Sequence, residues 1–349
     1  MRDRVPHPLG RRGRAGSTRG PLVPLITRRQ SRVAVSRPRL RPAGRASSVG
    51  PVNAAVGLIE RVLPSTVHLQ ARIPESHPSA RILGTERMGS GTVVDPSGLI
   101  LTVNYVVLGA EQVRVTLLDQ RAYVAEVVRH DYASGLALVR IPEDHLTALP
   151  LRRTTDLVPG EEAFIVASVG EGGARVASGA ISYIGPFDAN WEYVLDRAIM
   201  TTAMNPGLGG GPLLDTQGRV IGVVSLNLNE IGRFSLSIPA DYYLDGRDAL
   251  LGGRAPAATT RAWLGIFCYA VKDHVVIAGL LPGGPGEQAG LKAGDVILAV
   301  DGQDVGDRRS LYRLLWTHRP GEAVTLKIFR GREMRTVTVA SGDVEEFFS

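Results

Sequence analysis

The sequence predicts a mostly β protein with two antiparallel barrels in tandem, a linker and a smaller α+β domain. Valine-rich segments with alternating apolar positions recur about every 8–12 residues, a spacing typical of barrels and sandwiches. The 349 residues include 41 Gly and 22 Pro, enough for many tight turns, and only 5% are aromatic. A hydrophobic content of 44% is sufficient to fill more than one core.

Residues 1–50 are predicted to be a disordered leader. They contain 13 Arg and one Asp, a local charge of +12 that leaves about −6 for the rest of the chain. They show no apolar periodicity, so they cannot bury enough surface to offset their ordering entropy. Binding of nucleic acid or an anionic surface through this leader is kept as an alternative. We do not expect nucleic-acid binding, because no aromatic side chains interleave the arginines to stack on bases.

The chain lacks the apolar segments that membrane insertion or export requires. No run of about 18 apolar residues occurs, and Gly20–Ile26 is too short and too proline-broken for a signal-peptide core. We therefore expect no transmembrane segment and read the chain as cytoplasmic. A single cysteine, Cys268, excludes an intramolecular disulfide. No cofactor and no metal site are expected.

The elements follow in order from the hydrophobic pattern. An amphipathic helix is expected at Val52–Val62, a stop at Pro64-Ser65 and a strand at Val67–Ile73. The further strands expected in the first barrel are Gly89–Asp95, Ile100–Val107, Gln112–Leu118, Ala122–Arg129 and Leu136–Ile141. Those expected in the second barrel are Glu161–Gly170, Val176–Gly185, Tyr193–Ala203, Gly218–Leu228 and Gly232–Ala240.

The predicted domain boundaries follow from these elements. The double barrel spans residues 51–243, and a linker spans 244–260, where a short helix gives way to Gly, Ala, Pro and Thr. A compact unit with several strands and one helix spans 261–341, and 342–349 is a tail.

Four motifs, in the same order and at similar gaps, resemble the HtrA (Deg) family of trypsin-like proteases with one PDZ domain. "GSGTVVDPSGLILTVNYVV" resembles the family's GSG-hydrophobic-D-x-x-G-hydrophobic-TNxHVV, and "DYASGLALVRI" resembles D-x-x-x-DLAVLKI. "NPGLGGGPLLDTQGRVIGV" resembles NPGNSGGPLLDxxGxVIGV, and "GEQAGLKAGDVILAVDGQDV" is similar to the PDZ stretch A-x-x-AGLKxGDVIxxVNG. The resemblance covers roughly Val52 to Ala340 and implies a trypsin-like double barrel followed by a PDZ domain.

All three catalytic residues of the family are replaced in this chain. The family histidine falls on Tyr105, its aspartate on Gly135 and its serine on Gly209. A phenol has an ordinary pKa near 10 and is a poor general base, and the two glycines carry no side chain that could orient a base or attack a carbonyl. The resemblance therefore implies a degenerate triad.

A relocated triad is not expected. His130 and Asp131 lie near Gly135 in the sequence, but we expect them to form an exposed turn pair that faces away from the cleft. Serines such as Ser168 and Ser225 fall in strand patterns, where a satisfied hydroxyl is the usual outcome. A nucleophile and its base must meet within about 3 Å, on a scaffold built for other positions.

The glycines of the nucleophile loop allow two interpretations. The N–H groups of Gly207 and Gly209 could form a vestigial oxyanion hole. Alternatively, these glycines only permit the tight turn. We favour the turn, because an oxyanion hole serves catalytic turnover, and a site without a nucleophile has none.

The C-terminal unit departs less from its family. Trp263-Leu264-Gly265-Ile266 aligns with the loop that captures a peptide's terminal carboxylate, and Gly265 lets the backbone turn toward that group. Leu264 and Ile266, with Leu311 and Leu314 of the predicted helix, are expected to line an apolar pocket. The alternative is that they are core residues of a small domain.

The sequence therefore predicts a catalytically inactive HtrA-type protein that binds peptides or protein C-termini through its PDZ domain, as a scaffold or regulator. Family resemblance also implies HtrA-type homologues as oligomeric partners and a location in the cell envelope. The alternative is an active serine endopeptidase that uses non-standard residues.

Overall fold

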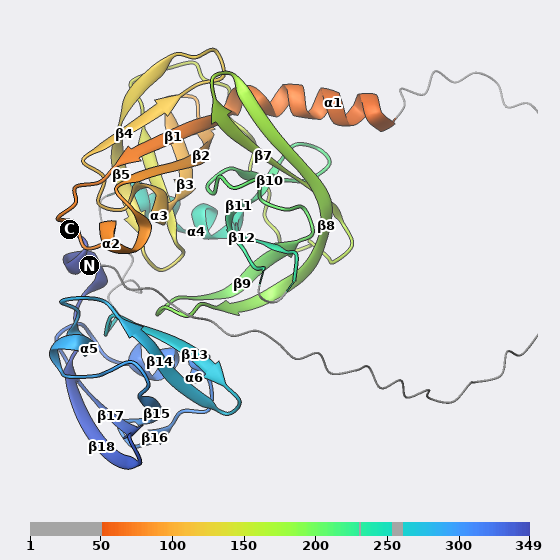
Figure 1. The fold of residues 1–349 in the computed structure, drawn as a ribbon. Coiled ribbons are helices and arrows are strands. Elements are labelled where there is room, and N and C mark those ends of the chain that lie inside the picture. The colour runs from red at the N-terminus through yellow and green to blue at the C-terminus, as the bar shows by residue number, and fades with distance from the viewer. Residues whose placement is uncertain (1–50, 230–231, 253–260) are drawn as a thin grey trace, which may run out of the picture. The chain divides into compact units, whose positions relative to one another are not determined.

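The computed structural model describes residues 51–229, 232–252 and 261–349 (Figure 1). Residues 1–50, and with them the predicted disordered leader and the nucleic-acid alternative, lie outside the described residues. The mostly β architecture is confirmed, with two closed six-stranded barrels followed by a mainly antiparallel sheet.

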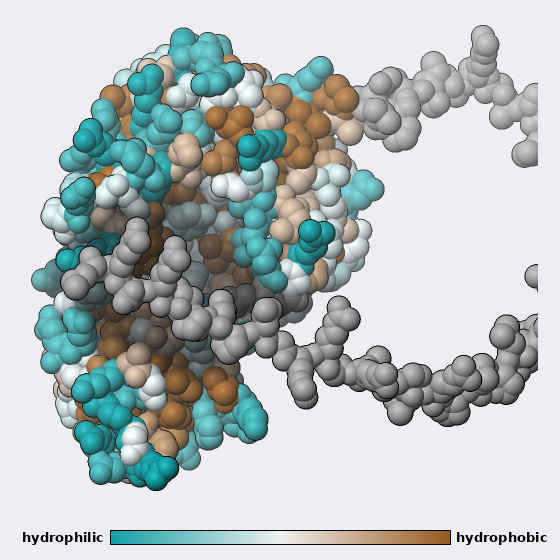
Figure 2. Space-filling view, in the orientation of Figure 1, coloured by the Kyte–Doolittle hydropathy of each residue, from teal (hydrophilic) through white to brown (hydrophobic). Residues whose placement is uncertain are grey.

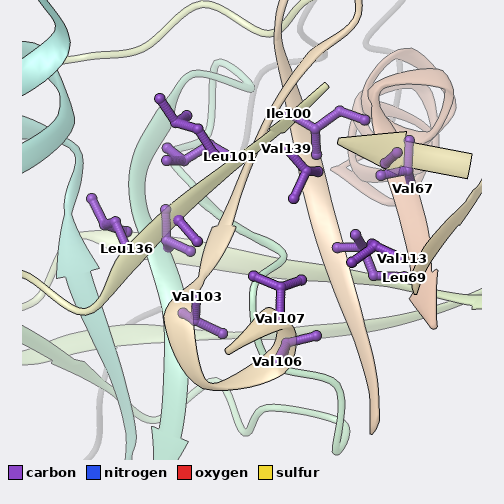
Figure 3. Close-up of a cluster of buried hydrophobic side chains, with 14 of the residues drawn as sticks. Val67, Leu69, Ile100, Leu101, Val103, Val106, Val107, Val113, Leu136 and Val139 are labelled. Carbon is purple, nitrogen blue, oxygen red and sulfur yellow. The ribbon is translucent and has the colours of Figure 1, made fainter. Parts of the chain in front are cut away.

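The first barrel, in the orange and yellow part of the ribbon in Figure 1, has the strand order β1-β2-β3-β6-β5-β4. Its strands are β1 (Thr66–Arg72), β2 (Glu86–Asp95), β3 (Leu99–Val103), β4 (Gln112–Thr116), β5 (Ala122–Asp131) and β6 (Leu136–Arg140). All five residues of β3 are buried, so this strand has no solvent-facing side. Figure 3 shows part of the aliphatic cluster that fills the barrel, including Val103, Val106 and Val107.

The second barrel closes in the order β10-β11-β12-β9-β8-β7. Its strands are β7 (Glu162–Gly170), β8 (Gly173–Asp188), β9 (Val194–Thr201), β10 (Pro212–Leu214), β11 (Val220–Asn227) and β12 (Ser235–Pro239). Strand β10 has no counterpart among the predicted strands; all three of its residues pair with β11, and Leu213 and Leu214 pair with β7 as well. The cluster that fills the first barrel extends to Leu195, Val223 and Leu236 of the second, and a separate cluster that includes Ile165, Ile199 and Leu213 fills the second barrel.

Helices cover the barrel ends. The predicted N-terminal helix is present as α1 (Pro51–Val62), followed by the 3-10 turn η1 (Leu63–Ser65). Leu58 and Val62 pack on Val166 and Leu214 of the second barrel. On the face shown in Figure 2, brown apolar residues gather where α1 lies, and Val56 of this helix is 48% exposed. A single turn, α2 (Ala80–Leu83), precedes β2.

Two segments differ from the prediction. The strand expected at Ile100–Val107 ends at Val103, and Asn104–Val107 forms the helical turn α3. Arg87 explains the change, because its buried guanidinium donates to the carbonyls of Tyr105 (2.9 Å) and Leu108 (3.0 Å), which a continued strand would not present together. The short helix expected before the linker is present as α4 (Ala240–Leu251), but it begins before residue 244, so the predicted boundary at residue 243 falls inside a helix that packs Tyr243 and Leu250 in the first-barrel cluster.

The C-terminal domain is a sheet with three short helices. Its strands are β13 (Ile266–Val271), β14 (His274–Leu280), β15 (Val296–Val300), β16 (Gln303–Asp304), β17 (Ala323–Arg330) and β18 (Glu333–Ala340). Of its helices, α5 is Pro285–Gln288 and α6 is Arg308–Leu315, the latter begun by a capping box in which Asp307 accepts from the N–H of Ser310. Core residues from every strand except β16 and from α6 fill the interior, among them Ile277, Ile297, Leu311 and Leu326.

The predicted tail at 342–349 contains ordered structure. Gly342 exchanges backbone hydrogen bonds with Trp263, and α7 (Val344–Phe347) is capped by the side chain of Asp343. The ring of Phe347 lies 4.8 Å from that of Trp263, centroid to centroid. These aromatic contacts bury apolar surface at the chain end, which the tail prediction did not consider.

Within the described residues, none of the helices has the length and apolar character needed to span a bilayer. Nor does that part of the chain group three or more His, Cys, Asp or Glu side chains where they could hold a metal ion.

Candidate functional site

Tyr105 fills the position where a nucleophile would stand. It sits in α3, directly after β3, and its phenol Oη donates to the backbone carbonyl of Ser225 at 2.9 Å. A Cβ added to Gly209 would lie 2.0 Å from this Oη, far inside contact distance. Burial raises the pKa of Tyr105 to about 12, so the phenol stays protonated and cannot accept a proton as a general base near neutral pH.

Backbone contacts hold the glycine loop around Gly209. The carbonyl of Gly209 accepts from Ser90 N–H at 2.8 Å, and Gly210 N–H donates to Val224 at 2.7 Å. Gly210 has a φ of +95°, and a Cβ there would lie 2.2 Å from the Ser90 carbonyl. The close approach of two strands therefore requires glycine at position 210.

One of the two N–H groups considered for a vestigial oxyanion hole, that of Gly207, already donates within the loop. The Asn205 side-chain oxygen accepts from Gly207 N–H at 3.1 Å and from Leu208 N–H at 3.2 Å. An oxyanion hole needs its N–H groups aimed at the substrate oxygen. The geometry at Gly207 is that of a side-chain-stabilised turn.

Gly135, at the position of the family's aspartate, has a φ of +79°, a conformation that strains other residues. A Cβ there would lie 3.0 Å from the hydroxyl oxygen of Tyr193, which donates to the Ser134 carbonyl at 2.6 Å. A second tyrosine therefore occupies the space beside the second replaced position, and burial raises its pKa well above the ordinary value.

His130 does not face away from the site, as the sequence analysis expected. The β5–β6 register places it opposite Ala137, and its Nδ1 contacts the side-chain oxygen of Asn104, the residue before Tyr105. Burial lowers the pKa of His130 to about 4, so the imidazole is neutral and weakly basic at pH 7. Asp131 stabilises the following turn, accepting from the N–H groups of Ala133 and Ser134.

Two hydroxyl–imidazole contacts occur between side chains in the described part of the chain, and neither resembles a nucleophile with its base. Ser79 contacts His77 at 2.7 Å, but it is 1% exposed and its oxygen also accepts from Arg87 at 2.6 Å. Thr317 contacts His318 at 3.3 Å, but its hydroxyl donates to the Leu314 carbonyl at 2.7 Å.

The predicted carboxylate loop holds a carboxylate. The backbone N–H groups of Leu264, Gly265 and Ile266 donate to the side-chain oxygens of Glu192 at 2.8, 2.8 and 3.1 Å. Gly265 has a φ of +73°, and a Cβ there would lie 3.2 Å from the Trp263 ring. The occupant is a side chain of the second barrel, which no sequence pattern had indicated.

The apolar residues predicted to line the groove lie mainly in the core. The side chains of Leu264, Ile266 and Leu311 are 0%, 1% and 0% exposed and belong to the core of the C-terminal domain. Leu314 is partly buried, and Trp263 packs on the aromatic residues of the C-terminus. The backbone of the loop, rather than these side chains, meets the bound carboxylate.

Comparison with known families agrees with this geometry. The trypsin-like peptidase domain family matches residues 89–223, and the PDZ domain family matches residues 262–340. The chain is a homologue of the DegP/HtrA proteases. The PDZ match includes β13 to β18 with α5 and α6, and the peptidase match runs from β2 of the first barrel to β11 of the second.

Curated relatives carry the name probable periplasmic serine endoprotease DegP-like. The protein from Halomonas elongata is 35% identical over 76% of this chain and 59% of its own length, and that from Hahella chejuensis is 32% identical over 73% and 57%. This chain thus spans less than two thirds of these relatives. Their names describe periplasmic proteins, so the cytoplasmic interpretation finds no support.

Solved structures of the HtrA-type protease AlgW are similar as well. AlgW with a decapeptide is 26% identical, with a TM-score of 0.51 over 82% of this chain and 98% of AlgW. AlgW with a tripeptide gives the same identity and TM-score over 82% and 96%.

Proposed function

We propose that this HtrA homologue is a pseudoprotease, a peptidase domain that has lost hydrolysis. The observation that carries the proposal is the contact between Tyr105 and Gly209. The phenol oxygen lies 2.0 Å from where a Cβ of residue 209 would be, so a serine cannot be added without moving Tyr105. In a comparable triad, loss of the nucleophile alone reduces turnover by about 10⁶-fold.

The second candidate is an active endopeptidase, which the names of the curated relatives favour. It would require a nucleophile outside the family position. Two serines lie beside the site: Ser90, which is fully buried, and Ser225, whose carbonyl accepts from Tyr105 and which is 9% exposed and is therefore the more accessible candidate.

A turnover assay with a covalent label separates the two candidates. Purified full-length protein is incubated with unfolded casein and, separately, with a fluorophosphonate that labels activated serines. We expect neither cleavage nor labelling. Cleavage that survives repurification and disappears in Ser225→Ala would establish a relocated nucleophile and refute the proposal. Gly209→Ala is unsuitable as a control, because its Cβ would collide with Tyr105.

The PDZ domain supplies the binding function that we propose for the protein. Three N–H groups already converge on one carboxylate, which is the requirement for capture of a peptide terminus. The AlgW structures with a decapeptide and a tripeptide show that relatives bind peptides. We place the protein in the cell envelope, by analogy with the periplasmic relatives, as a scaffold or regulator that can associate with HtrA-type homologues.

A further inference from the structure

The connection between β8 and β9 lies along the PDZ strand β13 like an added strand. Asn190 accepts a backbone hydrogen bond from the N–H of Cys268, and Trp191 pairs antiparallel with Phe267. Strand addition of this kind is the way in which PDZ domains hold extended peptides. The edge of β13 is therefore occupied by the chain's own residues.

The same segment supplies the carboxylate. Glu192 follows Trp191 directly, and its two oxygens accept from the three N–H groups of the loop before β13. A side-chain carboxylate thus stands where the terminal carboxylate of a peptide would bind.

Helix α6 holds the segment from the other side. Arg308 and Arg309 donate to the carboxylate of Asp188 at 3.0 and 2.9 Å. The hydroxyl of Tyr312 donates to the carbonyl of Ala189 at 3.0 Å. Arg308 and Tyr312 lie four residues apart, on one face of the helix. The segment is therefore contacted by β13, by the carboxylate loop and by α6.

We propose that Asn190–Glu192 is a built-in ligand of the PDZ groove, and that an external peptide binds only after this segment leaves. The proposal rests on the peptide-binding function proposed above and names its regulation. The two ligands exclude each other, because the N–H groups that an incoming terminus needs already donate to Glu192.

Release of the segment also affects the degenerate site, through the residue that follows Glu192. Tyr193 is the next residue, and its hydroxyl fills the space beside Gly135. Withdrawal of Glu192 from the groove pulls on the chain that positions this phenol. The PDZ groove and the position of the family's aspartate, Gly135, are thus connected through Glu192 and Tyr193, which are adjacent in the chain.

Hydrogen exchange of the full-length protein tests the docked segment without any peptide. Exchange of the stretch containing Leu264, Gly265 and Ile266 is measured by mass spectrometry in wild type, Glu192→Gln and Glu192→Ala. Glu162→Gln, which alters an exposed carboxylate on β7, is the matched control. We expect exchange to rise about tenfold or more in both Glu192 variants and to stay unchanged in the control. Unchanged exchange in the Glu192 variants would overturn the inference.

Peptide binding then tests the competition. The probes are a labelled ten-residue peptide that ends in valine with a free carboxylate, and its amidated twin. Suppose that wild-type molecules with Asn190–Glu192 in the groove outnumber those with an empty groove about ten to one. The acid peptide should then bind Glu192→Gln about tenfold more tightly than wild type. Equal affinity in the two proteins would overturn the inference. Faster exchange in the variants without preference for the acid peptide would support the docked segment and refute the proposed peptide-binding function.

Discussion

Tyr105 and Gly209 fit one another as a pair, although 104 positions separate them in the sequence. The phenol fills the volume that a serine side chain would need and donates to the Ser225 carbonyl. Tyr193 and Gly135 form a second pair of the same kind. In both cases a residue without a side chain faces a large, partly buried aromatic side chain, which fills the space beside the glycine.

This pairing predicts that restoring the serine alone is harmful. Gly209→Ser should reduce the free energy of unfolding by about 1–3 kcal/mol, because the new Cβ forces Tyr105 out of its place. Tyr105→His combined with Gly209→Ser should recover part of this loss, because imidazole is shorter than phenol. Urea unfolding followed by circular dichroism provides the measurement. A Gly209→Ser protein as stable as wild type would show that Tyr105 moves freely.

The sequence was sufficient to predict which catalytic groups of the family are replaced, because each position falls within a motif of fixed spacing. It could not show what fills their places. The partner of Gly135 is Tyr193, which belongs to a different barrel, and only the three-dimensional packing brings the two together. The orientation of His130 was mispredicted for a related reason, since it depends on the β5–β6 register and on the turn at Asn104.

At the scale of elements, the β8–β9 connection joins the second barrel to the PDZ groove. Its carboxylate, on Glu192, has a pKa raised to about 7, because burial outweighs the opposing effect of the three N–H donors. The nearby Cys268 thiol and Tyr312 phenol have pKa values raised by burial, so they stay protonated at neutral pH. Arg308 forms an ion pair with Asp188.

Docking of this connection should therefore depend on pH. With a pKa above the ordinary 4.5 in the docked state, Glu192 takes up a proton on docking, so docking is favoured as pH falls and is weakened as pH rises through 7. The terminal carboxylate of a peptide, with a pKa near 3.5, stays ionised over this range. The acid peptide should bind wild type about tenfold more tightly at pH 8 than at pH 5.5.

Fluorescence anisotropy at a series of pH values measures this dependence. Glu192→Gln should lose most of it, because the variant has no titrating group in the groove. A wild-type affinity that is flat over this range, or that weakens as pH rises, would contradict the assignment to Glu192.

Most elements could be predicted from the sequence. The helical turn α3, the start of α4 and the helix α7 in the C-terminal tail could not. Strand signals are local and were confirmed for β1, β4 and β6 within two residues or fewer. The turn α3 depends on Arg87, 17 positions before Asn104, and the start of α4 depends on packing against the first barrel. The tail forms α7 because Phe347 meets the ring of Trp263. These determinants are tertiary contacts and leave no local pattern.

At the scale of the whole molecule, stability is concentrated in the barrels and the PDZ core. Near the start of the described chain, helix α1 buries two side chains, Leu58 (4% exposed) and Val62 (2% exposed). They pack on Val220 of the second barrel and on Leu149 in the connection between the two barrels. Helix α1 thus anchors the described part of the chain to the barrels, and its amphipathic pattern could be recognised in the sequence.

Removing residues 1–50 should therefore leave thermal stability almost unchanged. The segment has no apolar periodicity and carries a charge of +12, so it has little surface to bury. Leu58→Ala should instead cost about 2–5 kcal/mol, because it opens a cavity between α1 and the second barrel. Differential scanning calorimetry of the two proteins compares the effects, with about 2–4 °C expected per kcal/mol in a domain of this size. A fall of several degrees on deletion of the basic segment would mean that it packs on the barrels, and would move the boundary of the folded chain toward the N-terminus.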